Sequence, residues 1–193
     1  QLTNSTLQIN AAVTVTINAA PAVPTAAGTN VCSGTQATLT ASGSTGSYRW
    51  YDAVAGGNLL SASATYTTTP LTVPASFYVE AVGTCNSARL KVDVGINPVP
   101  VVNSASAGSI CSGSALNYTI TSNVPGATFT CSRAAGANVS NPAVSGQTST
   151  DITETLINTS TSPVNVTYVI TPDANGCPGT PFNYVVTVNP APV

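Results

Sequence analysis

The chain has 193 residues, of which 42% are hydrophobic and 5% charged, with four basic side chains, six acidic ones and no histidine. So few basic residues cannot neutralise a phosphate backbone, and without histidine there is neither Ser-His-Asp nor Cys-His catalysis nor an imidazole metal ligand. We therefore expect no nucleic-acid partner, no enzyme activity and no cofactor. No run of 18 apolar residues occurs, so we expect no membrane insertion.

Short alternating segments follow one another along the chain and predict β-strands. In chain order the expected strands are 36–42, 47–52, 64–69, 76–82, 88–96, 115–121, 127–132, 151–157, 164–171 and 182–188. Turn signals such as Gly56-Gly57 and Asn175-Gly176 separate them, and no window has helical periodicity. Strands of this length and spacing predict an all-β fold of tandem immunoglobulin-like β-sandwiches.

Internal repeats divide the chain. Fourteen positions separate Asn18 from Cys32 and Asn97 from Cys111, and twelve separate Cys85 from Asn97 and Cys177 from Asn189. This agreement predicts an immunoglobulin-like domain at 21–98 and a second at 99–193, with 1–20 as the terminal strands of a preceding repeat. Proline-containing linkers at 18–24 and 97–100 favour stiff spacers and modules arranged end to end. We also expect the natural polypeptide to continue beyond residue 193.

The five cysteines predict disulfides. Each full repeat has one cysteine before its second strand and one after its penultimate strand, so the repeat predicts the bonds Cys32–Cys85 and Cys111–Cys177. Zinc is the competing interpretation, but the chain has no C-x-x-C pair. Disulfides imply an oxidising compartment outside the cytoplasm. The fifth cysteine, Cys131, takes the strand position that the core aromatic Trp50 has in the first repeat, which predicts a free buried thiol.

The motifs of both repeats resemble a known family. Residues 32–35, 48–52, 56–60 and 77–81 look like the Ig-like repeats of giant secreted proteins of Bacteroidota, and 110–118, 123–129 and 164–170 look like their PKD-like repeats. The resemblance departs at Cys131, where the family pattern has Trp. It implies export by the type IX system and display at the extracellular cell surface, in adhesins that include those of gliding bacteria. It supplies no catalytic residues.

Three further sets of side chains are candidate sites. Asp151 and Glu154 are candidate calcium ligands together with Asp173 or Asn175, although no D-x-D-x-D-G loop is present. Trp50, Tyr51 and Tyr66 are a candidate platform for stacking sugars. Arg49, Arg89 and Lys91 are more typical of a surface charge cluster than of a phosphate site.

Three functions fit these features. The first is a non-catalytic stalk or adhesin segment, with neighbouring repeats of the same chain as partners and a surface glycan or protein as its ligand. The second is a filament subunit that joins adjacent subunits by donating the strand at 1–20. The third is a spacer module of a secreted enzyme. We favour the first.

Overall fold

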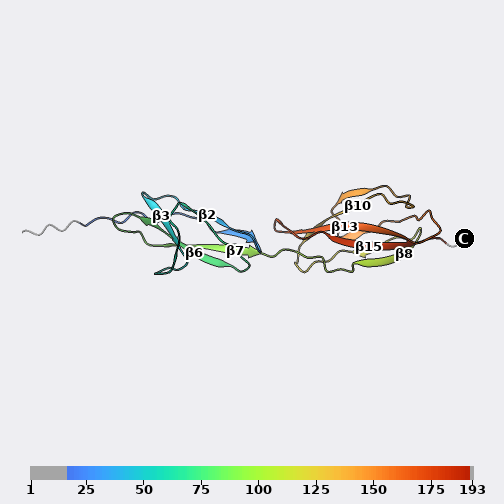
Figure 1. The fold of residues 1–193 in the computed structure, drawn as a ribbon, viewed down its shortest axis with the longest axis horizontal. Coiled ribbons are helices and arrows are strands. Elements are labelled where there is room, and N and C mark those ends of the chain that lie inside the picture. Colours follow the sequence, from blue (N-terminus) through green and yellow to red (C-terminus); the bar gives the residue numbers. More distant parts are fainter. Residues whose placement is uncertain (1–16, 192–193) are drawn as a thin grey trace, which may run out of the picture. The chain divides into compact units, whose positions relative to one another are not determined.

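The computed structural model describes residues 17–191, and all regular elements in that range are β-strands (Figure 1). The chain divides into two compact units. One holds the described part of Gln1–Gly28 with Thr38–Tyr66 and Ser76–Asp93, and the other holds Thr29–Ala37, Thr67–Ala75 and the described part of Val94–Val193. The predicted strand within 1–20, and with it strand donation, lies mostly outside the described residues, and 17–20 are not in a strand.

The strands between residues 29 and 97 form one five-stranded and one two-stranded sheet. The larger sheet has the order β1 (Thr29–Cys32), β7 (Leu90–Asn97), β6 (Ala75–Val82), β3 (Ser47–Tyr51), β4 (Leu59–Ser61). The smaller one pairs β2 (Thr38–Thr40) with β5 (Thr65–Thr67). The ring of Tyr66 in β5 lies 6.1 Å from Trp50 and 5.2 Å from Phe77, so the two sheets pack face to face.

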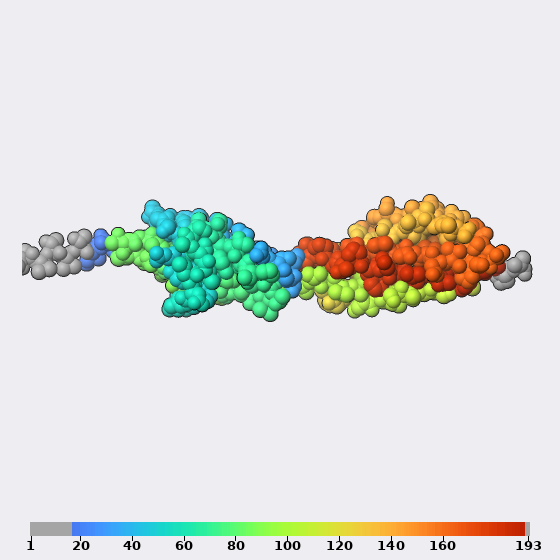
Figure 2. Space-filling model, viewed as in Figure 1, coloured from blue at the N-terminus to red at the C-terminus, as the bar shows by residue number. Residues whose placement is uncertain are grey.

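The strands after residue 106 repeat this arrangement. The larger sheet has the order β11 (Val144–Gln147), β10 (Thr128–Arg133), β13 (Val164–Ala174), β15 (Phe182–Asn189), β8 (Ala107–Cys111), and β14 (Cys177–Pro178) pairs with the end of β13. The smaller one pairs β9 (Tyr118–Thr119) with β12 (Asp151–Ile152). Tyr118 stacks on Tyr184 of β15 at 3.8 Å between the sheets. Figure 2 shows the orange segment that includes β10 against the red β13 and β15.

Alternation of side chains explains why these segments form half-buried strands. In β13 the residues at every second position from Val166 to Ala174 are buried, as are Tyr184, Val186 and Val188 in β15. Side chains of a strand point alternately to its two faces, so this pattern places one face in the core. The two sheet pairs confirm the predicted fold class, tandem immunoglobulin-like β-sandwiches.

The predicted strands are found, but five short ones were missed. These are β1, β4, β8, β11 and β14. The first four lie at the edges of the two larger sheets, and β14 pairs only with the end of β13. An edge strand gains its pairing from a neighbour distant in sequence, so its own residues need not alternate.

Trp50 and Cys131 have equivalent places, as the sequence indicated. Trp50 on β3 lies opposite Val79 of β6, and Cys131 on β10 lies opposite Ile170 of β13. The Trp50 side chain is fully buried, and Cys131 is a free thiol with 3% exposure. Among the described residues the indole Nε1 of Trp50 is a buried polar atom without a hydrogen-bond partner. In the second sandwich the stacked tyrosines supply the aromatic bulk.

Candidate functional site

The two cysteines of the first repeat lie on different segments, Cys32 in β1 and Cys85 in the loop before β7. Cys32 ends β1 and pairs in parallel register with Asn97, the last residue of β7. Cys85 lies in the loop between β6 and β7, five positions before the first residue of β7, and is a free thiol. Eight residues of strand extend about 23 Å, whereas the Cα atoms of a disulfide lie within about 7 Å. The predicted bond Cys32–Cys85 is therefore wrong.

The second repeat has the same geometry. Cys111 ends β8 and pairs with Asn189, the last residue of β15. Cys177 follows the turn after β13, opposite Ala174 and five positions before the beginning of β15. The bond Cys111–Cys177 was predicted from spacing and is also wrong, because the parallel pairing carries Cys111 to the far end of β15.

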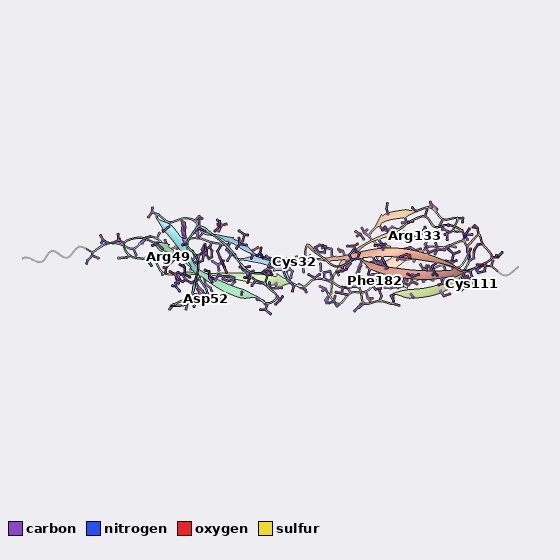
Figure 3. The ribbon with its side chains drawn as sticks, viewed as in Figure 1. Cys32, Arg49, Asp52, Cys111, Arg133 and Phe182 are labelled. Carbon is purple, nitrogen blue, oxygen red and sulfur yellow. A yellow bond between two sulfur atoms is a disulfide. The ribbon has the colours of Figure 1, made fainter. Side chains whose placement is uncertain are left out.

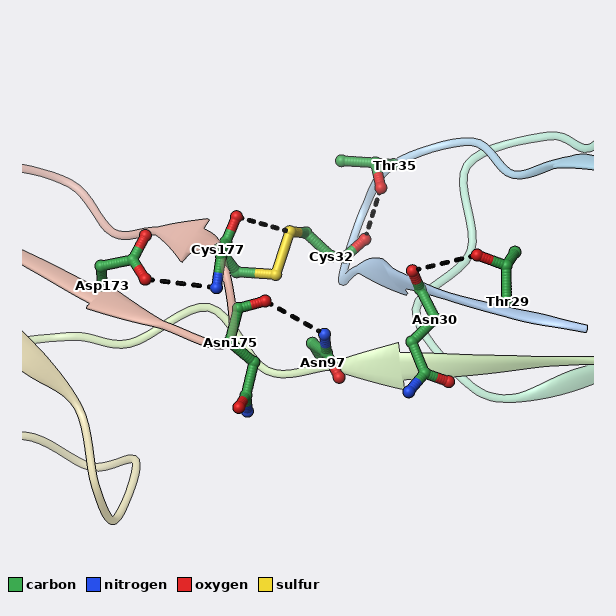
Figure 4. Close-up of a disulfide and its surroundings, with 9 residues drawn as sticks. Thr29, Asn30, Cys32, Thr35, Asn97, Asp173, Asn175 and Cys177 are labelled. Atoms are coloured by element: carbon green, nitrogen blue, oxygen red, sulfur yellow. Dashed lines mark hydrogen bonds between the residues drawn. A yellow bond between two sulfur atoms is a disulfide. The ribbon is translucent and has the colours of Figure 1, made fainter.

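Cys32 is instead bonded to Cys177. Their Cα atoms are 5.5 Å apart, and the bond spans a sequence separation of 145 (Figure 4). Both cysteines belong to the same compact unit, because Thr29–Ala37 groups with the residues after Val94. The bond thus links the predicted domain at 21–98 covalently to the one at 99–193.

A tight hairpin presents Cys177 to its partner. Asn175 and Gly176 both have positive φ, 54° and 74°, which defines the two-residue turn that fits the twist of antiparallel strands. A carboxylate oxygen of Asp173 accepts the Gly176 N–H at 3.2 Å. Asn97 donates from its side-chain amide to the Asn175 carbonyl at 3.4 Å, next to the bond (Figure 4). The residue before the linker and the hairpin thus hold each other in place.

The other three cysteines are free thiols of two kinds. Cys85 and Cys111 are exposed, whereas Cys131 is buried. Burial raises the pKa of Cys131, and the nearby carboxylate of Glu154 raises it further. Cys131 is therefore an unreactive core residue, and the exposed thiols are the chemically available ones.

The calcium candidates are separated by other interactions. Glu154 receives hydrogen bonds from Arg133 Nε at 2.9 Å and from the Tyr168 hydroxyl at 2.6 Å. Asp151 accepts from the Thr119 hydroxyl, and Asp173 belongs to the hairpin. Within residues 17–191 no three acidic, cysteine or histidine side chains gather where a metal ion could bind. The structure therefore gives these carboxylates structural roles.

The sugar-stacking candidates are divided between the core and an ion pair. Trp50 is buried in the core, and the half-buried Tyr66 packs on it. Tyr51 is covered by the Arg89 guanidinium, 3.4 Å from its ring centre, and donates its hydroxyl proton to Glu80 at 2.9 Å. The three rings do not form an open platform.

The predicted surface charge cluster is also divided. Arg89 is largely buried, pairs with Glu80 at 3.3 Å and donates to the carbonyls of Ala53 and Gly56. Lys91 pairs at the surface with Asp93 at 2.8 Å. With Arg133 on Glu154, three of the four basic side chains have a carboxylate partner.

One groove lies beside the edge strand β11. It has a volume of about 510 Å³ and is lined by 144, 146–149 and 151–154. The two carboxylates on its wall, Asp151 and Glu154, already accept hydrogen bonds from Thr119 and Arg133. Its lining offers no uncommitted charge to a ligand.

The sheets and their parallel outer strands define a protein of tandem immunoglobulin-like domains. Residues 21–98 match the family described as Ig-like domain CHU_C associated. Residues 108–192 match the family described as PKD-like domain. The first segment is thus similar to an Ig-like domain and the second to a PKD-like domain, and domains of these families are in general structural modules without catalytic activity.

Solved structures of immunoglobulin domains are similar to this chain at low sequence identity. The structure of DIP-gamma IG1+IG2 is 9% identical with a TM-score of 0.43, over 90% of this chain and 99% of that one. Sidekick-1 immunoglobulin domains 1–4 are 16% identical with a TM-score of 0.44, over 90% of this chain and 49% of that one. Drosophila OTK extracellular domains 3–5 are 12% identical with a TM-score of 0.43, over 88% of this chain and 60% of that one. No curated protein matches the sequence.

Within residues 17–191 no helix is long and apolar enough to cross a bilayer.

Proposed function

We propose that this chain is a non-catalytic, load-bearing segment of a bacterial cell-surface stalk or adhesin. The observation that carries the proposal is the Cys32–Cys177 bond, which joins the Ig-like segment covalently to the PKD-like segment. A bond of this kind adds nothing to an active site. It limits how far the chain can be extended.

The bond changes the path that a pulling force takes through the chain. Tension applied at residue 17 reaches Cys32 through β1, crosses to Cys177 and leaves through β14 and β15. The polypeptide between the two cysteines lies outside this path. The two cysteines are separated by 145 positions in the sequence. At about 3.4 Å per residue, the bond therefore prevents up to about 500 Å of extension.

Parallel pairing of the outer strands provides a second resistance when the bond is reduced. β1 runs parallel to β7, and β8 runs parallel to β15. The chain therefore enters each pair at one end and leaves it at the other. Tension then loads the hydrogen bonds of the pair together in shear, whereas an antiparallel hairpin would open one bond at a time.

An oxidising extracellular location agrees with the disulfide. Surface display, type IX export and an origin in Bacteroidota are part of the proposal, supported by the matches to Ig-like CHU_C-associated and PKD-like models. The many exposed Thr, Ser and Asn side chains suit contact with a surface glycan or a protein, and the neighbouring modules are the partners that the bond implies.

Single-molecule extension of the full chain between its termini tests the mechanical role. We expect the fully extended length of the oxidised chain to be shorter than that of the reduced chain by up to about 500 Å. Cys131→Ser is the matched control, because it removes a thiol without touching the bond. Equal final lengths in both redox states would contradict the role. Antibody labelling of intact producing cells tests the location, and labelling only after cell lysis would overturn it.

A further inference from the structure

The bond between Cys32 and Cys177 uses one cysteine of each repeat, and each repeat keeps one exposed cysteine unused. By the intervals of 14 and 12 residues, Cys111 corresponds to Cys32, and Cys85 corresponds to Cys177. Both unused thiols are exposed. In each repeat one cysteine is paired with the final Asn of the last strand, and the other lies five positions before that strand begins.

The backbone around Cys111 reproduces the backbone around Cys32. The residue after each cysteine donates its N–H to the last Asn of the neighbouring strand, Ser33 to Asn97 at 2.9 Å and Ser112 to Asn189 at 2.8 Å. The next residues, Gly34 and Gly113, have φ of 82° and 81°. Cys111 lies at the tip of β8 (Figure 3), held in the same geometry as the bonded Cys32 without a partner for its sulfur.

Cys85 lies beside Asn18, the residue that corresponds to Asn97 in the repeat. Asn97 is the residue opposite Cys32, and its side chain reaches the hairpin that presents Cys177. Asn18 takes the place of Asn97 in the preceding interval, and its carbonyl lies 3.7 Å from Cys85 Sγ. A cysteine paired with Asn18, in the way that Cys32 is paired with Asn97, would lie beside Cys85.

We propose that Cys111 and Cys85 are the two halves of the same crosslink, each bonding the complementary cysteine of a neighbouring Ig-like or PKD-like module. The neighbour is either a module of one continuous chain or a module of a second copy. In each bond two thiols lose two protons and two electrons to a disulfide donor such as oxidised glutathione, which becomes two thiols. The result is a succession of modules tied by one disulfide per junction. This deepens the proposed function by naming the partner.

A concatemer tests the proposal. Residues 1–189 are followed directly by residues 19–193, so that Asn189 takes the place of Asn18 before the native linker. Cys85→Ser in the first copy and Cys111→Ser in the second leave one Cys111 and one Cys85. After refolding in a glutathione buffer and alkylation, non-reducing peptide mapping should find Cys111 bonded to Cys85, together with two Cys32–Cys177 bonds.

The outcomes show whether the partner is in the same chain or in a second copy, and whether the proposal holds. The bond within a monomeric concatemer supports a neighbour in the same chain, and the bond within a dimer supports a second copy. Alkylated Cys111 and Cys85 beside two intact Cys32–Cys177 bonds would overturn the proposal while leaving the mechanical function untouched. A second control is the unduplicated chain carrying Cys85→Ser. If it formed Cys111–Cys111 bonds between molecules in the same yield as the Cys111–Cys85 bond in the concatemer, the proposal would also be overturned, because exposure alone would then explain the bond.

Discussion

Cys32 and Asn97 are register partners at the end of the parallel β1–β7 pair. This relationship decides the chemistry of the cysteines, because it fixes the Cys32 sulfur at the end of the sheet remote from Cys85. A strand that ran antiparallel to β7 over the same residues would instead place Cys32 toward the beginning of β7, on the side of Cys85. The crosslink between the two segments therefore follows from strand direction.

Thiol reactivity should separate the three free cysteines. We expect iodoacetamide at pH 8 to modify Cys85 and Cys111 within minutes, and Cys131 at least about 100-fold more slowly, because burial limits access and raises its pKa. Mass spectrometry of peptides at successive times measures the three rates. Urea-denatured protein is the control, in which the three thiols should react alike. Fast modification of Cys131 in the folded protein would contradict its place in the core.

Glu154→Gln should destabilise the second sandwich by about 3 kcal/mol. The Arg133 side chain is 1% exposed, and loss of the carboxylate leaves its charge buried without a counter-ion. The shift of the urea midpoint, followed by circular dichroism, measures the effect. Asp93→Asn is the matched control, since it breaks an exposed ion pair with Lys91 and should leave the midpoint unchanged. Equal shifts for the two variants would show that burial of Arg133 is unimportant.

The same pair should make stability depend on pH. Burial acts to raise the pKa of Glu154, but the hydrogen bonds from Arg133 and Tyr168 outweigh it and hold that pKa below its usual 4.5. A carboxyl group whose pKa is lower in the folded state stabilises the fold above its unfolded pKa and loses this contribution as the pH falls through its folded pKa. Between pH 6 and pH 3 the urea midpoint should fall more steeply for the wild type than for Glu154→Gln. Parallel curves would contradict this assignment.

Trp50→Ala should cost about 3–5 kcal/mol, since it empties a fully buried site between the sheets. Trp50→Phe should cost clearly less, because it keeps a ring against Tyr66 and removes an indole N–H that has no partner among the described residues. Urea midpoints followed by circular dichroism compare the two. A loss for Phe as large as that for Ala would mean that the indole contributes more than its packing.

Local patterns allowed much of the fold to be predicted from the sequence. Alternation placed the long inner strands β6, β7, β13 and β15, and Asn175-Gly176 marked a turn that the structure shows with two positive φ values. The equivalence of Trp50 and Cys131 followed from aligning the repeats. The ion pairs of Arg89 and Arg133 were missed, because their partners Glu80 and Glu154 are 9 and 21 positions away and no local pattern links them.

The amino-acid sequence alone was enough to predict that the chain is all-β, that it repeats, and that each full repeat has two corresponding cysteines. Those properties depend on side-chain alternation and spacing, which act over a few residues. Which cysteines bond depends on the three-dimensional fold. The spacing of Cys32 and Cys85 is the same whether the edge strand runs parallel or antiparallel to β7, but strand direction alone fixes the end of the sheet to which each sulfur is carried.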